Sequence, residues 1–146
     1  MASYPEKLAE LVADFEQITD RTERQEYLIE IADHFPDVKV PAEVASKPYA
    51  ESHRVPACES EAFVWAQEQS DGTLKYYFDV LNPQGLSAMA MSVILDETCS
   101  GQPLEQVATV DPSIVFSLFG KEISMGKGRG LMGIVTMVQR EAKARL

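Results

Sequence analysis

Two runs of aromatic and β-branched residues near the middle of the chain constrain its fold more than any other feature. The runs cover 62–69 and 73–81, and the triplet Ser70-Asp71-Gly72 joins them. An Asp-Gly pair between two such runs is a strong signal for a tight hairpin turn, because both residues tolerate positive φ. The sequence therefore predicts an antiparallel hairpin, around which the remaining elements must pack.

Helical patterns precede this hairpin. Ser3 begins a capping-box pattern, after which apolar residues recur at helical spacing between positions 8 and 18. Asp20 caps a second apolar stripe that ends at Pro36, because proline cannot continue a helix. We expect the two helices to form an antiparallel pair, followed over 37–49 by an ordered surface connection without regular periodicity.

Further helices are expected after the hairpin. Asn82-Pro83 is a typical start for a helix that reaches about Thr98, and Asp111-Pro112 is a typical start for a short one. The last helix is predicted over 129–143. Helices at both ends around a small antiparallel sheet make an α+β fold, and a chain of 146 residues suits one domain over 1–146.

The charge balance and the hydropathy exclude several classes of partner. Thirteen basic residues against 23 acidic ones give a net charge of −10, which opposes the phosphate contacts on which nucleic-acid affinity depends. The acidic surface would instead steer the protein toward a basic patch on a partner. No apolar run approaches the roughly 20 residues that span a bilayer. The N-terminus lacks a basic region followed by an apolar stretch, so we expect no membrane contact and a reducing, cytoplasmic compartment.

Chemistry-bearing side chains are few. The two cysteines, Cys58 and Cys99, form no Cys-x-x-Cys pair, and together with His34 and His53 they do not make the four-ligand pattern of a structural zinc site. Cys58 precedes the hairpin, two residues after a proline that favours an irregular turn. A thiol on a loop braced by a sheet is positioned for nucleophilic or sulfur-transfer chemistry. The alternative interpretation is a small, buried, unreactive side chain.

The segment around Cys58 resembles the SufE family. That family has a Val-x-Gly-Cys-Gln-Ser-like loop, then a strand with Val-Trp, with a Leu-Pro-like helix stop before the loop and a Gly-Leu pair in the C-terminal helix. The counterparts here run through nearly the whole chain: Phe35-Pro36, Arg54-Val55-Pro56-Ala57-Cys58-Glu59-Ser60, Phe63-Val64-Trp65 and Gly130-Leu131.

The sequence departs from the family pattern at several positions. Ala57 stands where the family has glycine, and Glu59 stands where it usually has glutamine. Trp65 lies two residues beyond the family tryptophan, an offset that keeps the same strand face. Near the C-terminus, Lys127 falls at the position of the family arginine, and Arg129 follows two residues later.

The resemblance implies a SufE/IscU-like α+β fold and a function in iron–sulfur cluster assembly. Cys58 would accept persulfide sulfur from a SufS-type cysteine desulfurase, a pyridoxal-phosphate enzyme, stimulate it, and pass the sulfur to an Fe-S scaffold. The protein would act as a stoichiometric sulfur carrier more than as an enzyme, with no cofactor of its own. Ala57 and Glu59 leave open a regulatory adaptor without persulfide chemistry. A thiol hydrolase or peroxidase is disfavoured, because the sequence offers no triad-like base and no resolving cysteine.

Other residues keep two interpretations each. Cys99 is expected to be packed near a helix end, and His53 is either a plain surface histidine or an aid to the thiol. Asp79 lies close to a position where the family has an acidic residue, but it equally suits an ordinary strand end. The glycine-rich segment 126–130 matches neither a dinucleotide fingerprint nor a P-loop, so we interpret it as a flexible connection into the last helix.

Overall fold

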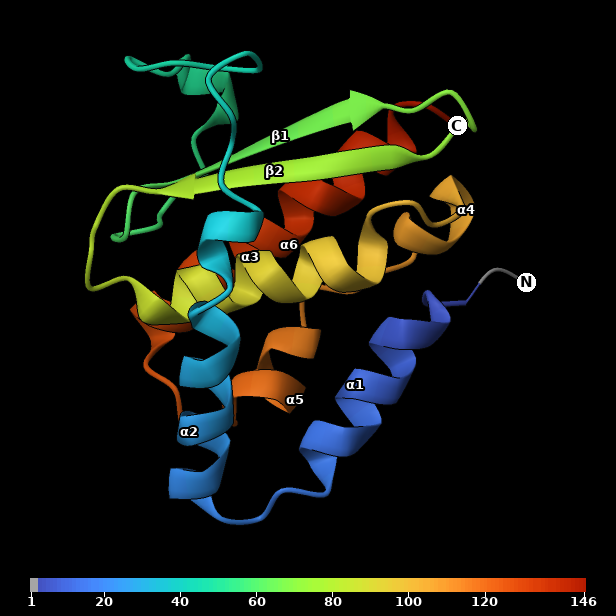
Figure 1. Ribbon diagram of the computed structural model, residues 1–146. Coiled ribbons are helices and arrows are strands. Elements are labelled where there is room, and N and C mark those ends of the chain that lie inside the picture. The colour runs from blue at the N-terminus through green and yellow to red at the C-terminus, as the bar shows by residue number, and fades with distance from the viewer. Residues whose placement is uncertain (1–2) are drawn as a thin grey trace.

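The computed structural model describes residues 3–146, in which the α-helices lie on one side of a single antiparallel hairpin (Figure 1). This architecture confirms the predicted α+β class. In chain order the elements are α1 (Glu6–Glu16), α2 (Arg21–Ala32), β1 (Ala62–Glu68), β2 (Leu74–Val80), α3 (Leu86–Cys99), α4 (Leu104–Val107), α5 (Ile114–Phe119) and α6 (Met125–Lys143), with short 3-10 turns at Phe35–Asp37 and Glu51–His53.

The hairpin forms where the sequence predicts it. β1 and β2 pair antiparallel with Val64 opposite Phe78, and both strands end within one residue of the predicted runs. Gly72 adopts a φ of 85° in the connecting turn, a conformation that glycine reaches without steric cost. The side chain of Asp71 accepts hydrogen bonds from the backbone N–H and the hydroxyl of Thr73, so the turn is fixed from within.

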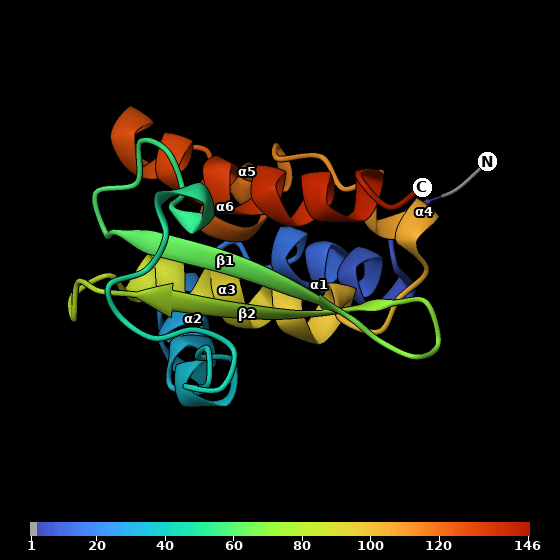
Figure 2. The ribbon, with the colours of Figure 1, turned by 90° about the horizontal axis from the view of Figure 1, so that it is seen from above.

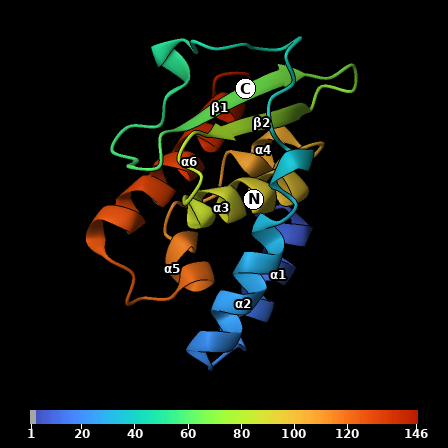
Figure 3. The ribbon, with the colours of Figure 1, turned by 60° about the vertical axis from the view of Figure 1, so that its left-hand side comes forward.

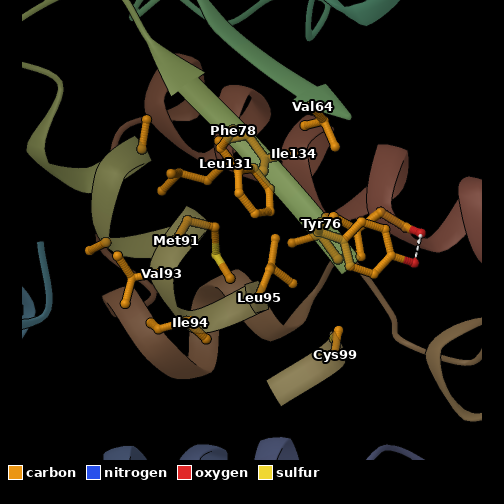
Figure 4. Packing of buried hydrophobic residues seen from close by; sticks show 14 of the residues in the cluster. Val64, Tyr76, Phe78, Met91, Val93, Ile94, Leu95, Cys99, Leu131 and Ile134 are labelled. Carbon is orange, nitrogen blue, oxygen red and sulfur yellow. Dashed lines mark hydrogen bonds between the residues drawn. The ribbon is translucent and has the colours of Figure 1, made fainter. Parts of the chain in front are cut away.

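Both faces of the hairpin are covered. Helices α3 and α6 pack on one face, where Tyr76 and Phe78 enter the main core (Figure 4). The connection over residues 38–53 crosses the opposite face (Figures 1 and 3) and is tied to the edge of β2, because the Val40 N–H donates to the Phe78 carbonyl. Under this connection Val40, Phe63 and Trp65 form a second, smaller buried cluster.

The N-terminal helices run in opposite directions and are joined by a short turn (Figure 1). Asp20 caps α2 as predicted, by accepting from the Thr22 and Glu23 N–H groups. The predicted cap at Ser3 is wrong, because Pro5 occupies the residue before α1 and no side chain caps it. Arg24 ties this region to α5: its guanidinium donates to the backbone carbonyls of Phe15, Ile18, Ser117 and Leu118.

Two predicted helix starts need correction, and one helix was missed. The segment opening at Asn82-Pro83 is a turn, in which the Asn82 side chain accepts from the Gln84 N–H, and α3 begins only at Leu86. The helix α4 was not predicted. Helix α6 begins at Met125 instead of Arg129, because the Ser124 hydroxyl caps it by accepting from the Lys127 N–H. The glycines of its first turns hide this start from a propensity argument.

Across the described residues 3–146, none of the helices combines the length and the apolar character that crossing a bilayer demands.

Candidate functional site

Cys58 lies on a tight loop over residues 55–61, here called the Cys58 loop, that leads into β1. Backbone hydrogen bonds close this loop: the Val55 N–H donates to the Ala62 carbonyl at 2.8 Å, and the Glu61 N–H donates to the Cys58 carbonyl at 3.1 Å. Ala57 and Glu61 both adopt positive φ, at 60° and 54°. Since an L residue pays roughly 1–2 kcal/mol for this conformation, the loop is held in a strained form.

Cys58 lines a cleft where three helices approach one another. Cys58 is a free, half-buried cysteine packed against the main core. The cleft measures about 530 Å³ and is lined by the Cys58 loop, by one side of α2 and by the first residues of α3 and α6. Figures 1 and 2 show the starts of β1, α3 and α6 at the same end of the molecule. A partner can therefore reach the thiol from this end.

Exposed apolar side chains surround the cleft. Ile29 and Leu86 line it while remaining 48% and 47% exposed, and Met125 is 78% exposed between two residues that also line it. Glu59 and Lys127 add one charge of each sign to the lining. Large apolar groups exposed together around a hollow are typical of a surface that another molecule covers.

Two helices direct their N-terminal ends at this cleft. Helix α3 starts at Leu86 without a side-chain cap, and α6 starts at Met125 beside the lining residue Ser124. The N-terminus of a helix carries partial positive charge and unpaired N–H groups, which attract anions. Two helix N-termini and Lys127 therefore bring positive charge to the cleft, where Glu59 contributes one negative charge.

The side chains of Arg54 and His53 make their contacts away from the cleft. The Arg54 guanidinium pairs with Glu51 at 3.0 Å and lies 4.8 Å from the centre of the Phe63 ring. The His53 Nδ1–H donates to the Val64 carbonyl at 2.9 Å, and the ring stacks on Trp65. Phe63 and Trp65 belong to the smaller cluster on the outer face of the sheet, so neither basic residue is brought to the cleft.

Asp79 also belongs to the outer face. It is 3% exposed, and its carboxylate accepts from the Tyr49 hydroxyl at 2.6 Å and from the Val80 N–H at 2.8 Å. Burial, together with this hydrogen bond and the charge of Asp79, raises the pKa of Tyr49 to about 12. The pair fastens the outer connection to β2, which makes Asp79 a structural residue in this fold.

Cys99 is a core residue at the far end of α3 (Figure 4). It is 1% exposed, and burial raises the pKa of its thiol to about 12. At 1.5 Å per residue, the length of α3 separates Cys99 from Leu86 at the cleft by about 20 Å. A disulfide requires Cα atoms within about 7 Å, so Cys58 and Cys99 cannot pair in this fold.

The two basic residues of the segment 126–130 differ in their placement. Lys127 lines the cleft, whereas Arg129 is exposed and lies outside the lining. Among residues 3–146, no three His, Cys, Asp or Glu side chains gather in a way that could hold a metal ion. Sequence reasoning missed that the segment 126–130 is helical and faces the Cys58 loop. Ser124, a residue type that often caps helices, was the signal that could have revealed it.

Comparison with known proteins places this geometry in context. A family model described as "SufE: Fe-S metabolism associated domain" matches residues 9–142. Among solved structures, the chain is similar to the solution structure of a hypothetical protein from Thermus thermophilus, with a TM-score of 0.70 and 24% identity over 97% of each chain. That likeness concerns the fold alone. No curated protein matches the chain.

Proposed function

Because this chain belongs to the SufE family, a domain associated with Fe-S metabolism, we propose that it accepts persulfide sulfur on Cys58 and carries it toward iron–sulfur cluster assembly. The observation that carries the proposal is the position of Cys58, a free thiol on a closed loop that opens onto a cleft of about 530 Å³. Cys99 lacks this access, because it is buried in the core at the other end of α3.

The proposed step is a persulfide exchange with a SufS-type cysteine desulfurase. The Cys58 thiolate attacks the terminal sulfur of the persulfide held by the desulfurase, and a new S–S bond forms at Cys58. The S–S bond in the desulfurase breaks at the same time, and its cysteine leaves as a thiolate. One sulfur atom moves and no external oxidant or reductant is needed. Transfer to an Fe-S scaffold repeats the exchange in the opposite sense.

The cleft suits the product of this step. A persulfide is longer than a thiol by one sulfur atom, and the hollow in front of Cys58 leaves space for it. The N-terminal ends of α3 and α6 favour the negative charge that the terminal sulfur carries. Lys127 supplies a further positive charge in the lining. These features support storage of a sulfur that free thiols would otherwise remove.

The surface around the cleft supports docking of a partner. Ile29, Leu86 and Met125 provide apolar contact at the rim, and the net charge of −10 favours a basic counterpart. The same surface would serve a regulatory adaptor that stimulates a desulfurase without accepting sulfur, which is the second candidate function.

Desulfurase turnover with a Cys58→Ser variant separates the two candidates. Serine is close to cysteine in size but forms no persulfide, so a carrier loses its stimulation of alanine production while its binding to the desulfurase persists. Cys99→Ser is the matched control and keeps the stimulation. If Cys58→Ser stimulated turnover as well as the unmodified protein, the carrier function would be excluded and the adaptor function would replace it.

A further inference from the structure

The Cys58 loop rests on a helix face that carries no side chain beneath the cysteine. Gly130 of α6 lies directly against it: a Cβ atom built on Gly130 would be 3.2 Å from the Cys58 Cα, 3.4 Å from its Sγ and 3.5 Å from the Ala57 carbonyl oxygen. Ordinary carbon contacts begin at about 3.5 Å. A methyl group at position 130 would therefore require Cys58 to shift by a few tenths of an ångström.

Two more glycines flank this contact. A Cβ on Gly133, one turn further along α6, would lie 2.8 Å from Val55 Cγ1 at the start of the loop. A Cβ on Gly85, which precedes α3, would lie 2.9 Å from Ser60 Cβ near the end of the loop. The beginning, the centre and the end of the Cys58 loop thus each rest on a glycine.

Two of these glycines are costly where they stand. Glycine inside a helix destabilises it by about 1 kcal/mol relative to alanine, and Gly130 and Gly133 lie in the interior of α6. Flexibility does not explain them, because the segment is regular helix. The close approach of the loop does explain them, since a methyl group would clash with Val55 at position 133 and would make an unusually tight contact with Cys58 at position 130.

We propose that Gly85, Gly130 and Gly133 are positioning residues that seat the Cys58 loop on the helices, so that the sulfur faces the cleft instead of projecting from the surface. The strained backbone at Ala57 and Glu61 belongs to the same seating. The accessibility of Cys58 is thus set by α6, although the two are far apart in sequence. This seating does not depend on the proposed function. Only its effect on sulfur transfer rests on that function.

The test compares alkylation of Cys58 by iodoacetamide in Gly130→Ala and Gly128→Ala. Both substitutions add one methyl group to a buried position of the same helix. A Cβ on Gly128 would meet Ile123 Cδ1, at 3.2 Å, and its nearest neighbours belong to Ile123 and Phe116 instead of the Cys58 loop. In Gly130→Ala the methyl displaces Cys58 toward the open cleft, so the rate should rise about fivefold or more, which corresponds to about 1 kcal/mol. In Gly128→Ala it should stay within about twofold of the unmodified protein. An unchanged or slower rate in Gly130→Ala would overturn the proposal.

A double-mutant cycle gives a second test that needs no reactive thiol. Gly133→Ala should lower the urea midpoint, because its methyl clashes with Val55, and Val55→Ala should lower it by leaving a cavity. The double variant should lose clearly less stability than the two single losses combined, because trimming Val55 makes room for the methyl. Strictly additive losses would contradict the seating.

Both tests use the protein alone, so they remain decisive whether or not sulfur is transferred. If Cys58 gained no sulfur from a desulfurase but Gly130→Ala still exposed the thiol, the proposed function would fail and the seating would stand. If transfer occurred but the alkylation rates were equal, the seating would fail and the function would stand.

Discussion

Replacing Ala57 by glycine should stabilise the protein. Ala57 has a φ of 60°, a conformation that costs an L residue roughly 1–2 kcal/mol and costs glycine almost nothing. Glycine also gains about 0.4–1 kcal/mol of conformational entropy in the unfolded chain, which offsets part of this relief. The free energy of unfolding should therefore rise by about 0.5–1 kcal/mol in Ala57→Gly.

The assay is urea unfolding, with thermal unfolding as a check. For a chain of this size the gain corresponds to a rise in Tm of about 1–4 °C. Ala50→Gly is the matched control, because Ala50 is also exposed and has an ordinary φ of −65°. The free energy of unfolding should fall by about 0.5–1 kcal/mol in this control. If Ala57→Gly were destabilised as much as Ala50→Gly, the strained conformation of the Cys58 loop would be wrong.

Three further predictions concern the core and the partner. Cys99→Ser should keep sulfur transfer within about threefold of the unmodified protein, which a desulfurase assay checks. It should cost about 1–3 kcal/mol of stability in urea titrations, because a buried thiol becomes a polar hydroxyl. Stability should fall as pH rises from about 9 to about 12, because burial holds the pKa of the Cys99 thiol at about 12 while the unfolded chain loses that proton near 9.0. In Cys99→Ala part of that fall should disappear from urea titrations across the same pH range. Arg24→Met should lose about 2–3 kcal/mol of unfolding free energy, because four backbone carbonyls lose a charged donor. Arg21→Met, at an exposed neighbour, is the control, and a smaller loss in Arg24→Met than in this control would contradict the role of Arg24.

Local signals predicted much of the fold. The Asp-Gly turn fixed the hairpin to within a residue, and Asp20 caps α2 as its side chain chemistry predicts. These predictions succeeded because turns and caps depend on a few neighbouring residues. The start of α6 failed for the opposite reason: Gly126, Gly128 and Gly130 disfavour a helix locally, and of these only Gly130 closely approaches the Cys58 loop.

The candidate site could be predicted only in part. The position of Cys58 on a loop before β1 followed from Pro56 and the flanking β-forming residues, and the resemblance to the SufE family singled out this thiol. The sequence could not decide between the alternative roles of His53 and Asp79, because the choice depends on where their side chains point. The structure turns both residues to the outer face, through contacts with Trp65 and Tyr49 that lie far away in sequence. The cleft itself lies between α2, α3 and α6, and no local sequence pattern predicts that these three helices lie close together.

The mass of the intact protein after incubation with a cysteine desulfurase and cysteine tests the central claim most directly. The account predicts a gain of about 32 Da, one sulfur atom, in the unmodified protein and in Cys99→Ser, and no gain in Cys58→Ser. Reduction with a thiol reagent should remove the added mass, because a persulfide is reducible. A gain of sulfur in Cys58→Ser, or none in the unmodified protein while the desulfurase turns over, would contradict the claim that Cys58 accepts the sulfur.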